Sequence, residues 1–169
     1  RDAYNSVIWL IMEIGKAMEN QYCLVRQERN TGTHGGASTE DDRQTRTLNV
    51  KRFDADIVSL SSNVLTLASG VYLIHAVAPG FHCGRHRLFL VDNDTDADIA
   101  VGSNAYSAYD PSEGTASHSQ FHARVETDGT EEYRIEHYTE LAKSVSGLGV
   151  AVGDGEVAVN CSVEILKVG

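Results

Sequence analysis

The sequence predicts an all-β sandwich of about ten antiparallel strands, preceded by one N-terminal α-helix. Three observations support this fold class. The 169 residues include 15 Gly but only 2 Pro, a composition that suits many tight turns. From Arg46 onwards, short β-like runs alternate with turn signals at the spacing of a sandwich or barrel. A helical pattern of apolar residues opens the chain, and the total length suits one domain.

The first element is a helix, expected over residues 1–20, which contains the most apolar run of the chain, VIWLIMEI. Apolar residues recur there at steps of three and four and fall on one seam: Tyr4, Val7, Ile11, Ile14 and Met18. Isoleucine at both seam positions favours three or four strands over two, and so short a helix is marginal alone. It needs a partner, either its own β-domain, other copies of the chain or another protein, and we favour an assembly.

Residues 21–169 are expected to form the β-domain. Gln21–Gln27 is its first strand, and the polar stretch Glu28–Gln44 is expected to be an exposed, mobile loop. Further strand-like runs cover residues 45–53, 57–62, 63–69, 70–80, 86–93, 98–106, 119–127, 131–139, 148–153 and 156–168. Since no helices separate these runs, they predict a jelly roll or a related sandwich.

Two local patterns refine this expectation. Asp128-Gly129 and Asp154-Gly155 are hairpin signals, because both residues tolerate the positive φ of a tight turn. In the last run, apolar residues alternate with small or polar ones and predict a strand with one wet face; they are Val157, Val159, Cys161, Val163 and Ile165.

The charge pattern excludes several classes of function. With 14 Lys and Arg against 24 Asp and Glu, the net charge of −10 disfavours nucleic acid and anionic lipid as partners. The opening apolar run is too short to cross a bilayer, and Glu13 and Lys16 interrupt it, so we expect no membrane insertion. It also lacks the flanks of a secretory signal, since Asp2 precedes it and no clean cleavage motif follows.

The three cysteines, Cys23, Cys83 and Cys161, have no C-x-x-C spacing. Three reduced, buried thiols are the simplest interpretation. The alternative is a disulfide between Cys23 and Cys161 that ties the first strand to the last. Cys83 would then be free or would link subunits.

No motif predicts catalysis, and we expect neither an enzyme nor a cofactor. The chain has no Gly-x-Ser-x-Gly, no placed Ser, His and Asp trio, and no phosphate-binding Gly-rich loop. The carboxylates of Asp92, Asp94 and Asp96 are weak candidates for calcium, but the EF-hand pattern fails, and a solvated hairpin loop explains them better. The HCGRH run supplies at most three zinc ligands, fewer than a structural site needs.

The loop SNAYSAYDPSEGTASHSQ is the better candidate for binding. Tyr106, Tyr109 and Asp110 lie among small polar residues, a mixture typical of recognition surfaces, because tyrosine buries a large area at a low entropic cost. Packing of one or both tyrosines into an interface between subunits is the equal alternative.

The order of several segments resembles the tip domain of tailed-bacteriophage fibre and spike proteins, whose fold is similar to the jelly rolls of tumour necrosis factor and the complement globular head. The segments are TRTLN, SLSSNVLTLASGVYLIHAVAP, HRLFLVDNDTDADIAVGSNAY and GLGVAV. The resemblance covers roughly residues 21–169. It implies a homotrimer of TNF-like jelly rolls displayed on a virion.

In such a trimer, the helix would anchor the domain to other virion proteins, and the exposed loops would touch a host glycan or surface protein. His118 and His122 could then face the threefold axis. Two further hypotheses remain open: a structural decoration or connector protein without a receptor, and a complement-like extracellular ligand.

Overall fold

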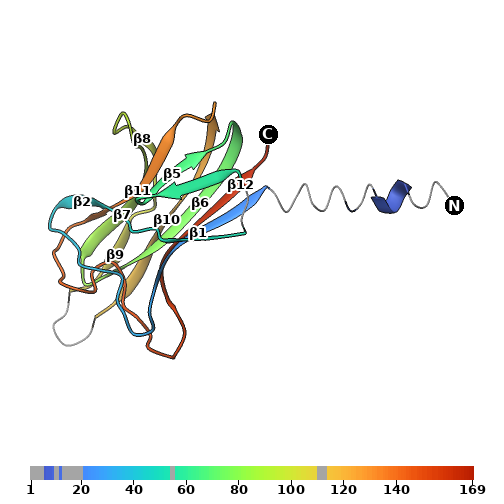
Figure 1. Ribbon diagram of the computed structural model, residues 1–169. Helices are drawn as coiled ribbons and strands as arrows, with labels where there is room; N and C mark the ends of the chain where they lie inside the picture. Colours follow the sequence, from blue (N-terminus) through green and yellow to red (C-terminus); the bar gives the residue numbers. More distant parts are fainter. Residues whose placement is uncertain (1–5, 10–11, 13–20, 54–55, 110–113) are drawn as a thin grey trace.

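The computed structural model describes residues 6–9, 12, 21–53, 56–109 and 114–169. Twelve strands in these ranges form two antiparallel sheets that pack face to face (Figure 1). The predicted all-β sandwich is therefore confirmed. Residues 6–9 and 12 are helical, and Val7 and Trp9 among them are exposed. The other predicted seam residues, Tyr4, Ile11, Ile14 and Met18, lie outside the described residues.

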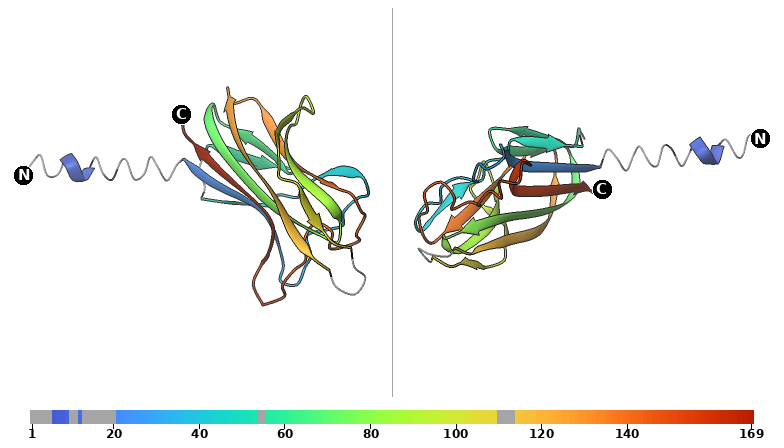
Figure 2. Two further views of the ribbon diagram at one scale, coloured as in Figure 1. Left: turned by 180° about the vertical axis from the view of Figure 1, so that it is seen from behind. Right: turned by 90° about the horizontal axis from the view of Figure 1, so that it is seen from below.

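The first sheet has five strands and joins the beginning of the β-domain to its end. Its order is β10 (Ala116–Thr127), β6 (Gly70–Phe81), β12 (Ala158–Lys167), β1 (Tyr22–Arg29) and β3 (Val50–Arg52). The pairing of β1 with β12 places the start of the domain beside its end, as the blue and red strands show in Figure 2.

The second sheet has seven strands. Its main order is β4 (Val58–Ser61), β5 (Val64–Leu67), β11 (Glu132–Thr139), β7 (Gly84–Asp92) and β8 (Asp98–Val101). Two short strands extend it, since β2 (Asp42–Thr45) pairs with β11 and β9 (Ala105–Ser107) pairs with β7. Apart from the consecutive pairs β4–β5 and β7–β8, neighbouring strands in both sheets are not consecutive in the sequence, which is the connectivity of a jelly roll.

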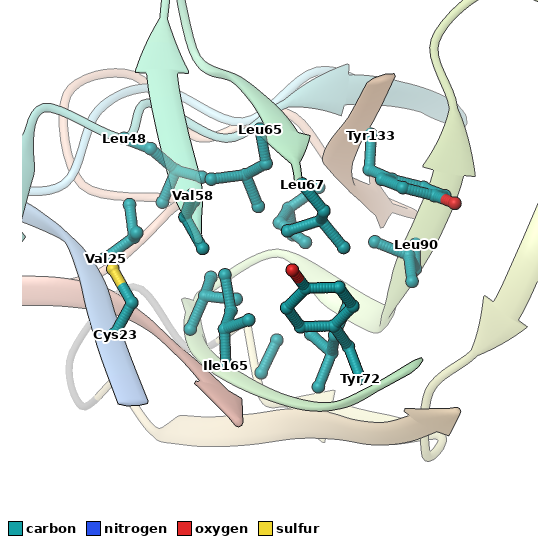
Figure 3. Close-up of a cluster of buried hydrophobic side chains, with 14 of the residues drawn as sticks. Cys23, Val25, Leu48, Val58, Leu65, Leu67, Tyr72, Leu90, Tyr133 and Ile165 are labelled. Atoms are coloured by element: carbon teal, nitrogen blue, oxygen red, sulfur yellow. The ribbon is translucent and has the colours of Figure 1, made fainter. Parts of the chain in front are cut away.

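The core lies between the sheets and follows the period-2 alternation of the strands. Figure 3 shows side chains from both sheets meeting there; they include Val25, Leu65, Leu67, Tyr72, Leu90 and Ile165, all 1% exposed or less. The one hydroxyl in this group is satisfied, because Tyr72 donates to the carbonyl oxygen of Ala68 over 2.8 Å. The longer strands therefore contribute one apolar face each to the core.

The polar stretch 28–44 is more ordered than expected. Gly35 and Ser38 are buried, and residues 42–44 form most of β2. The Ser38 hydroxyl donates to the carbonyl oxygen of Leu141 over 2.8 Å and accepts from the Lys143 amide over 2.9 Å. The segment has few apolar residues, so apolar patterning could not predict its order. Hydrogen bonds of the Ser38 hydroxyl and of the Gly35, Gly36 and Ser38 amides hold it instead.

Residues 148–153 do not form the expected strand. Leu148 is buried at the end of a turn, Gly149 has a φ of +130°, and Val152 is 86% exposed. An added Cβ at Gly149 would lie 2.5 Å from Oδ1 of Asn160, so the close approach to β12 also requires glycine. The alternation of apolar residues in LGVAVG therefore belongs to a loop.

A β-bulge in β12 changes which residues of the last run face the core. Gln27 is opposite Cys161 and Glu28 is opposite Val159, so Asn160 is the extra residue. Asn160 and Cys161 are both buried, whereas Val157 and Val159 are 54% and 42% exposed. The prediction that Val157 and Val159 share a face with Cys161 is wrong for this reason.

The candidate disulfide is not formed: Cys23, Cys83 and Cys161 are buried, and no sulfur–sulfur bond joins any two of them. The strands that carry Cys23 and Cys161 do pair, but Cys23 lies opposite Ile165 and Cys161 opposite Gln27. This offset of four residues, 161 to 165, places the two residues about 13 Å apart along the strands. A disulfide needs Cα atoms within about 7 Å, so the register excludes the bridge.

Among the described residues, no helix combines the length and the apolar character that spanning a bilayer requires.

Candidate functional site

Below the surface, at one end of the sandwich, a buried arginine connects both sheets and two loops. Arg46 is fully buried, and its Nη2 donates to Oε1 of Gln27 over 2.9 Å and to the carbonyl oxygens of Leu148 and Asn160 over 3.0 and 2.5 Å. Within the described ranges no carboxylate pairs with it. Burial lowers the pKa of Arg46, and the neutral acceptors partly compensate its lost hydration.

Arg46 also fixes the tautomers of two buried histidines. Its Nη1 lies 3.4 Å from Nδ1 of His137, and because a guanidinium only donates, this nitrogen must accept. Nε2 of His137 therefore carries the proton and donates to Nδ1 of His86 over 2.9 Å. His86 in turn donates from Nε2 to the Ser117 hydroxyl over 2.7 Å.

The direction of these hydrogen bonds is wrong for nucleophilic catalysis by Ser117. A histidine that activates serine must accept the hydroxyl proton, whereas His86 is here the donor. Burial and the neighbouring positive charge lower the pKa of His86 to about 4 and lower the pKa of His137 well below its usual range. Both imidazoles are thus held neutral, and the arrangement is suited to structure.

The outer face of the seven-stranded sheet carries a polar and aromatic surface that fits binding better. We call it the recognition surface; it consists of Arg85, Arg87, Asn104, Tyr106 and Tyr138. Strand pairing places Tyr138 of β11 opposite Arg87 of β7, and Arg85 opposite Tyr106 of β9 (strands labelled in Figure 1). A groove of about 500 Å³ lies over these strands, and Phe89 and Ala105 contribute to its lining.

Carboxylates already bind two of the polar side chains at this groove, those of Arg85 and Tyr138. Arg85 binds Glu140 with both its backbone amide and its guanidinium and lowers the pKa of that carboxyl to about 2. The Tyr138 hydroxyl donates to Oδ1 of Asp41 over 2.9 Å, which raises the pKa of Tyr138. Arg87 differs, because its guanidinium donates to the neutral amide oxygen of Asn104.

Of the predicted binding residues, Tyr106 lies on the recognition surface and is 62% exposed. Tyr109 is also exposed, and its ring is edge-on to that of His82 with the centroids 5.8 Å apart. Neither tyrosine lines the groove itself. Asp110 lies outside the described residues. Arg87 and Tyr138 were not among the predicted binding residues, although the alternation of their strands places both on the outer face.

Two of the three candidate calcium-binding carboxylates at the end of β7 and in the following loop, those of Asp92 and Asp96, are already engaged. Oδ1 of Asp92 accepts from the amides of Asp94 and Thr95 and from the Thr95 hydroxyl, over 2.8–3.0 Å. Asp96 pairs with Arg134 over 2.7 Å. In the part of the chain that the structure describes, no three His, Cys, Asp or Glu side chains are arranged to hold a metal ion.

The outer face of the five-stranded sheet is different in character. It contains an apolar groove of about 550 Å³, which we call the histidine groove; its lining includes Tyr22, Leu73, His75, His122, Arg124 and Leu166. His75 and His122 stack with ring centroids 4.3 Å apart, and Glu164 lies 3.8 Å from His75. Leu73 and Leu166 are 47% and 41% exposed, which leaves apolar surface open to a partner.

Comparisons with known proteins define the fold and no more. No family model matches the chain, and no curated protein sequence is similar to it. Solved structures do match. The globular domain of zebrafish complement 1qA protein has a TM-score of 0.57 at 14% identity, and murine APRIL at pH 5.0 has 0.53 at 5%. Each match covers 88% of this chain and 98% of the other. The chain thus has a complement- and TNF-like jelly-roll fold.

Proposed function

We propose that this protein is a trimeric attachment module of a bacteriophage virion, which uses the recognition surface to contact the host cell. The observation that carries the proposal is the difference between its two outer faces. One face has an apolar groove with exposed Leu73 and Leu166, and the opposite face has arginine, asparagine and tyrosine side chains. Such a pair of faces suits assembly on one side and recognition on the other.

Assembly through the histidine groove is supported by its chemistry. Leu73 and Leu166 lie opposite each other on neighbouring strands, and their exposed apolar surface is costly in water. A second copy of the chain would cover this surface. The jelly-roll fold and the isoleucine-rich N-terminal seam both favour three copies. Placement on a virion follows from the resemblance to fibre and spike tips, with the N-terminal segment as the anchor to other virion proteins.

Recognition through the opposite face is supported by exposed Tyr106 and half-buried Tyr138 beside the two arginines. Tyrosine and arginine are enriched where proteins bind partners, since both offer large contact areas with polar ends. A host-surface glycan or protein is the expected target. Tyr109 and Asp110 stay predictions as further contacts from the adjoining loop.

The test combines solution mass with cell binding, both on the whole chain. Light scattering should give a mass near three chains, unchanged by reductant, and Leu73→Asp should shift it towards one chain. Val101→Asp is the matched control, because Val101 is an exposed apolar residue of the other sheet, 52% exposed. A monomeric native protein would contradict the trimer.

For recognition, labelled protein should bind host cells, and Tyr106→Ala should weaken binding at least tenfold without changing the solution mass. A trimer that binds no cells and yet is required for particle stability would instead be a structural decoration or connector protein.

A further inference from the structure

We propose that the groove around Arg87 binds the carboxylate of an acidic sugar, with Arg87 and Asn104 as the residues that recognise the charge. This inference rests on the proposed function, because it names the ligand class of the same recognition surface. Three features of the groove carry it: an arginine without an acidic partner, a paired amide, and a hollow of suitable size and lining.

The first feature is the state of Arg87. The other three arginines of this face are neutralised. Arg85 pairs with Glu140, and Arg43 pairs with Asp98 over 2.6 Å. Arg134 pairs with Asp96 over 2.7 Å and with Glu136 over 2.8 Å. Within the described residues, Arg87 has no carboxylate partner and uses one donor on the oxygen of Asn104. A guanidinium presents five N–H donors in a planar fork, so Arg87 retains the geometry that binds a carboxylate with two parallel hydrogen bonds.

The second feature is Asn104, which directly precedes β9 and contacts Arg87 of β7. Its side-chain oxygen accepts from Arg87, which directs its NH₂ group away from the guanidinium. Asn104 is exposed at the groove, and Arg87 is half-buried beneath it. The pair therefore offers N–H donors from two side chains to one anionic group. The Asn104 oxygen, which would repel an anion, is turned towards Arg87.

The third feature is the shape and lining of the hollow. Its volume of about 500 Å³ is within the range of sites for small molecules, which is about 300–1,000 Å³. Tyr138, Phe89 and Ala105 add apolar surface beside the polar pair. A sugar ring, with apolar C–H faces and polar edges, matches a lining of this kind.

Charge selects a ligand with one carboxylate rather than a polyanion. None of the residues that line the groove is acidic, but the chain as a whole carries a net charge of −10. A nucleic acid or a heavily sulfated polymer would extend beyond the groove and meet this negative surface. A monosaccharide acid or a chain end would place its single charge at Arg87.

The experiment measures binding of small sugars to the whole protein by NMR titration. Glucuronic acid should shift the amide signals of β7 and β9 with millimolar affinity, whereas glucose should bind at least tenfold more weakly. Inorganic phosphate is the third probe and should also bind at least tenfold more weakly than glucuronic acid. Equal binding of glucose, or equal or tighter binding of phosphate, would overturn the acidic sugar as the ligand.

Two variants test the assigned residues. Asn104→Asp keeps the size of the side chain but pairs Arg87 with a carboxylate, so it should abolish glucuronic acid binding in a protein that still folds. Arg87→Gln should weaken binding at least tenfold. Arg52→Gln should have no effect, because Arg52 is an exposed arginine of the other sheet and lines neither groove. Native affinity in Asn104→Asp would overturn the inference.

The inference and the proposed function fail separately. If host-cell binding depends on Tyr106 while glucuronic acid leaves every spectrum unchanged, the ligand class is wrong and the attachment function stands. If acidic sugars bind at Arg87 but cells are not bound, the site is right and attachment is wrong.

Discussion

The guanidinium of Arg46 donates to the carbonyl oxygen of Leu148 over 3.0 Å, across a sequence separation of 102 residues. These residues belong to TRTLN and GLGVAV, two of the segments on which the resemblance to phage tip domains rests. The amide of Leu148 in turn donates to the carbonyl oxygen of Gly36, so the same contact orders the polar stretch 28–44. The two motifs thus describe one buried junction.

Loss of the Arg46 side chain should be the most costly single change at this junction. Arg46→Met fills similar space but leaves the acceptors of Gln27, Leu148 and Asn160 buried without donors. We expect the free energy of unfolding to fall by about 3–5 kcal/mol, measured by urea denaturation at pH 7.5. Arg52→Met removes an exposed arginine that forms a surface ion pair with Glu28, and should change it by less than about 1 kcal/mol. Similar losses in both variants would contradict the proposed role of the junction.

The two neutral histidines predict a loss of stability in mild acid. The pKa of His86 in the folded protein is about 4, against an ordinary value of 6.5, so the unfolded chain binds its proton more tightly. Stability from this group is fully present above pH 6.5 and is lost as the pH falls towards 4, by about 3 kcal/mol. Urea curves at pH 7.5, 5.5 and 4.5 measure this loss, and His137, whose pKa is lowered more strongly, adds to it.

Carboxylates change the stability at lower pH than the histidines do, so the two contributions can be measured separately. Arg85 lowers the pKa of Glu140 to about 2, so its contribution is lost only below about pH 4.5. His86→Gln should therefore reduce the pH dependence between 6.5 and 4.5 and leave the steeper loss below it. An unchanged dependence in this variant would assign the mild-acid effect to other groups.

The thiols should be unreactive until the protein unfolds. Cys23, Cys83 and Cys161 are buried, and burial raises the pKa values of the Cys83 and Cys161 thiols, which keeps them in the less reactive protonated form. An aromatic disulfide reagent should modify none of them within minutes under native conditions and all three in 6 M guanidinium chloride. Fewer than three thiols after denaturation without reductant would indicate a disulfide.

The loop after β7 should be stabilised by its own hydrogen bonds rather than by calcium. Asp92→Ala removes an acceptor of three hydrogen bonds and should lower the unfolding midpoint by about 3 °C. Asp94→Ala is the matched control, since Asp94 contributes only its backbone amide to this turn. Millimolar calcium should leave the midpoint of the native protein unchanged, and a rise of several degrees would restore the calcium interpretation.

Most strands could be predicted because apolar and polar residues alternate along a half-buried strand, and this alternation is visible in the sequence. β6, β7, β10 and β11 all fall within one to three residues of the expected runs. The errors have local causes: an unpaired residue at Asn160, and a glycine turn at Gly149 that interrupts an alternating sequence. Neither feature can be recognised from residue types alone. The bulge depends on the pairing of β12 with β1, and the glycine turn depends on the close approach of Gly149 to β12.

The candidate site was less predictable because it depends on register. Tyr106 was identified by its polar surroundings, but its value as a site comes from Arg85 across the strand and from the nearby groove. Arg87 and Tyr138 are separated by about fifty residues in the sequence, and only the pairing of β7 with β11 brings them together. A single sequence gives the face of each residue but not its neighbour on the next strand.

The pairing of β1 with β12 has a practical consequence for protein engineering. The amide of Lys167 donates to the carbonyl oxygen of Gln21 over 2.8 Å, so the two ends of the domain can be joined by a linker of a few glycines. New termini could then open at Gly153–Gly155, an exposed turn where an added Cβ would meet no atom within 4 Å at either glycine. Such a circular permutant would move the chain termini to the other end of the sandwich, and with them the attachment point that we propose for the N-terminal segment.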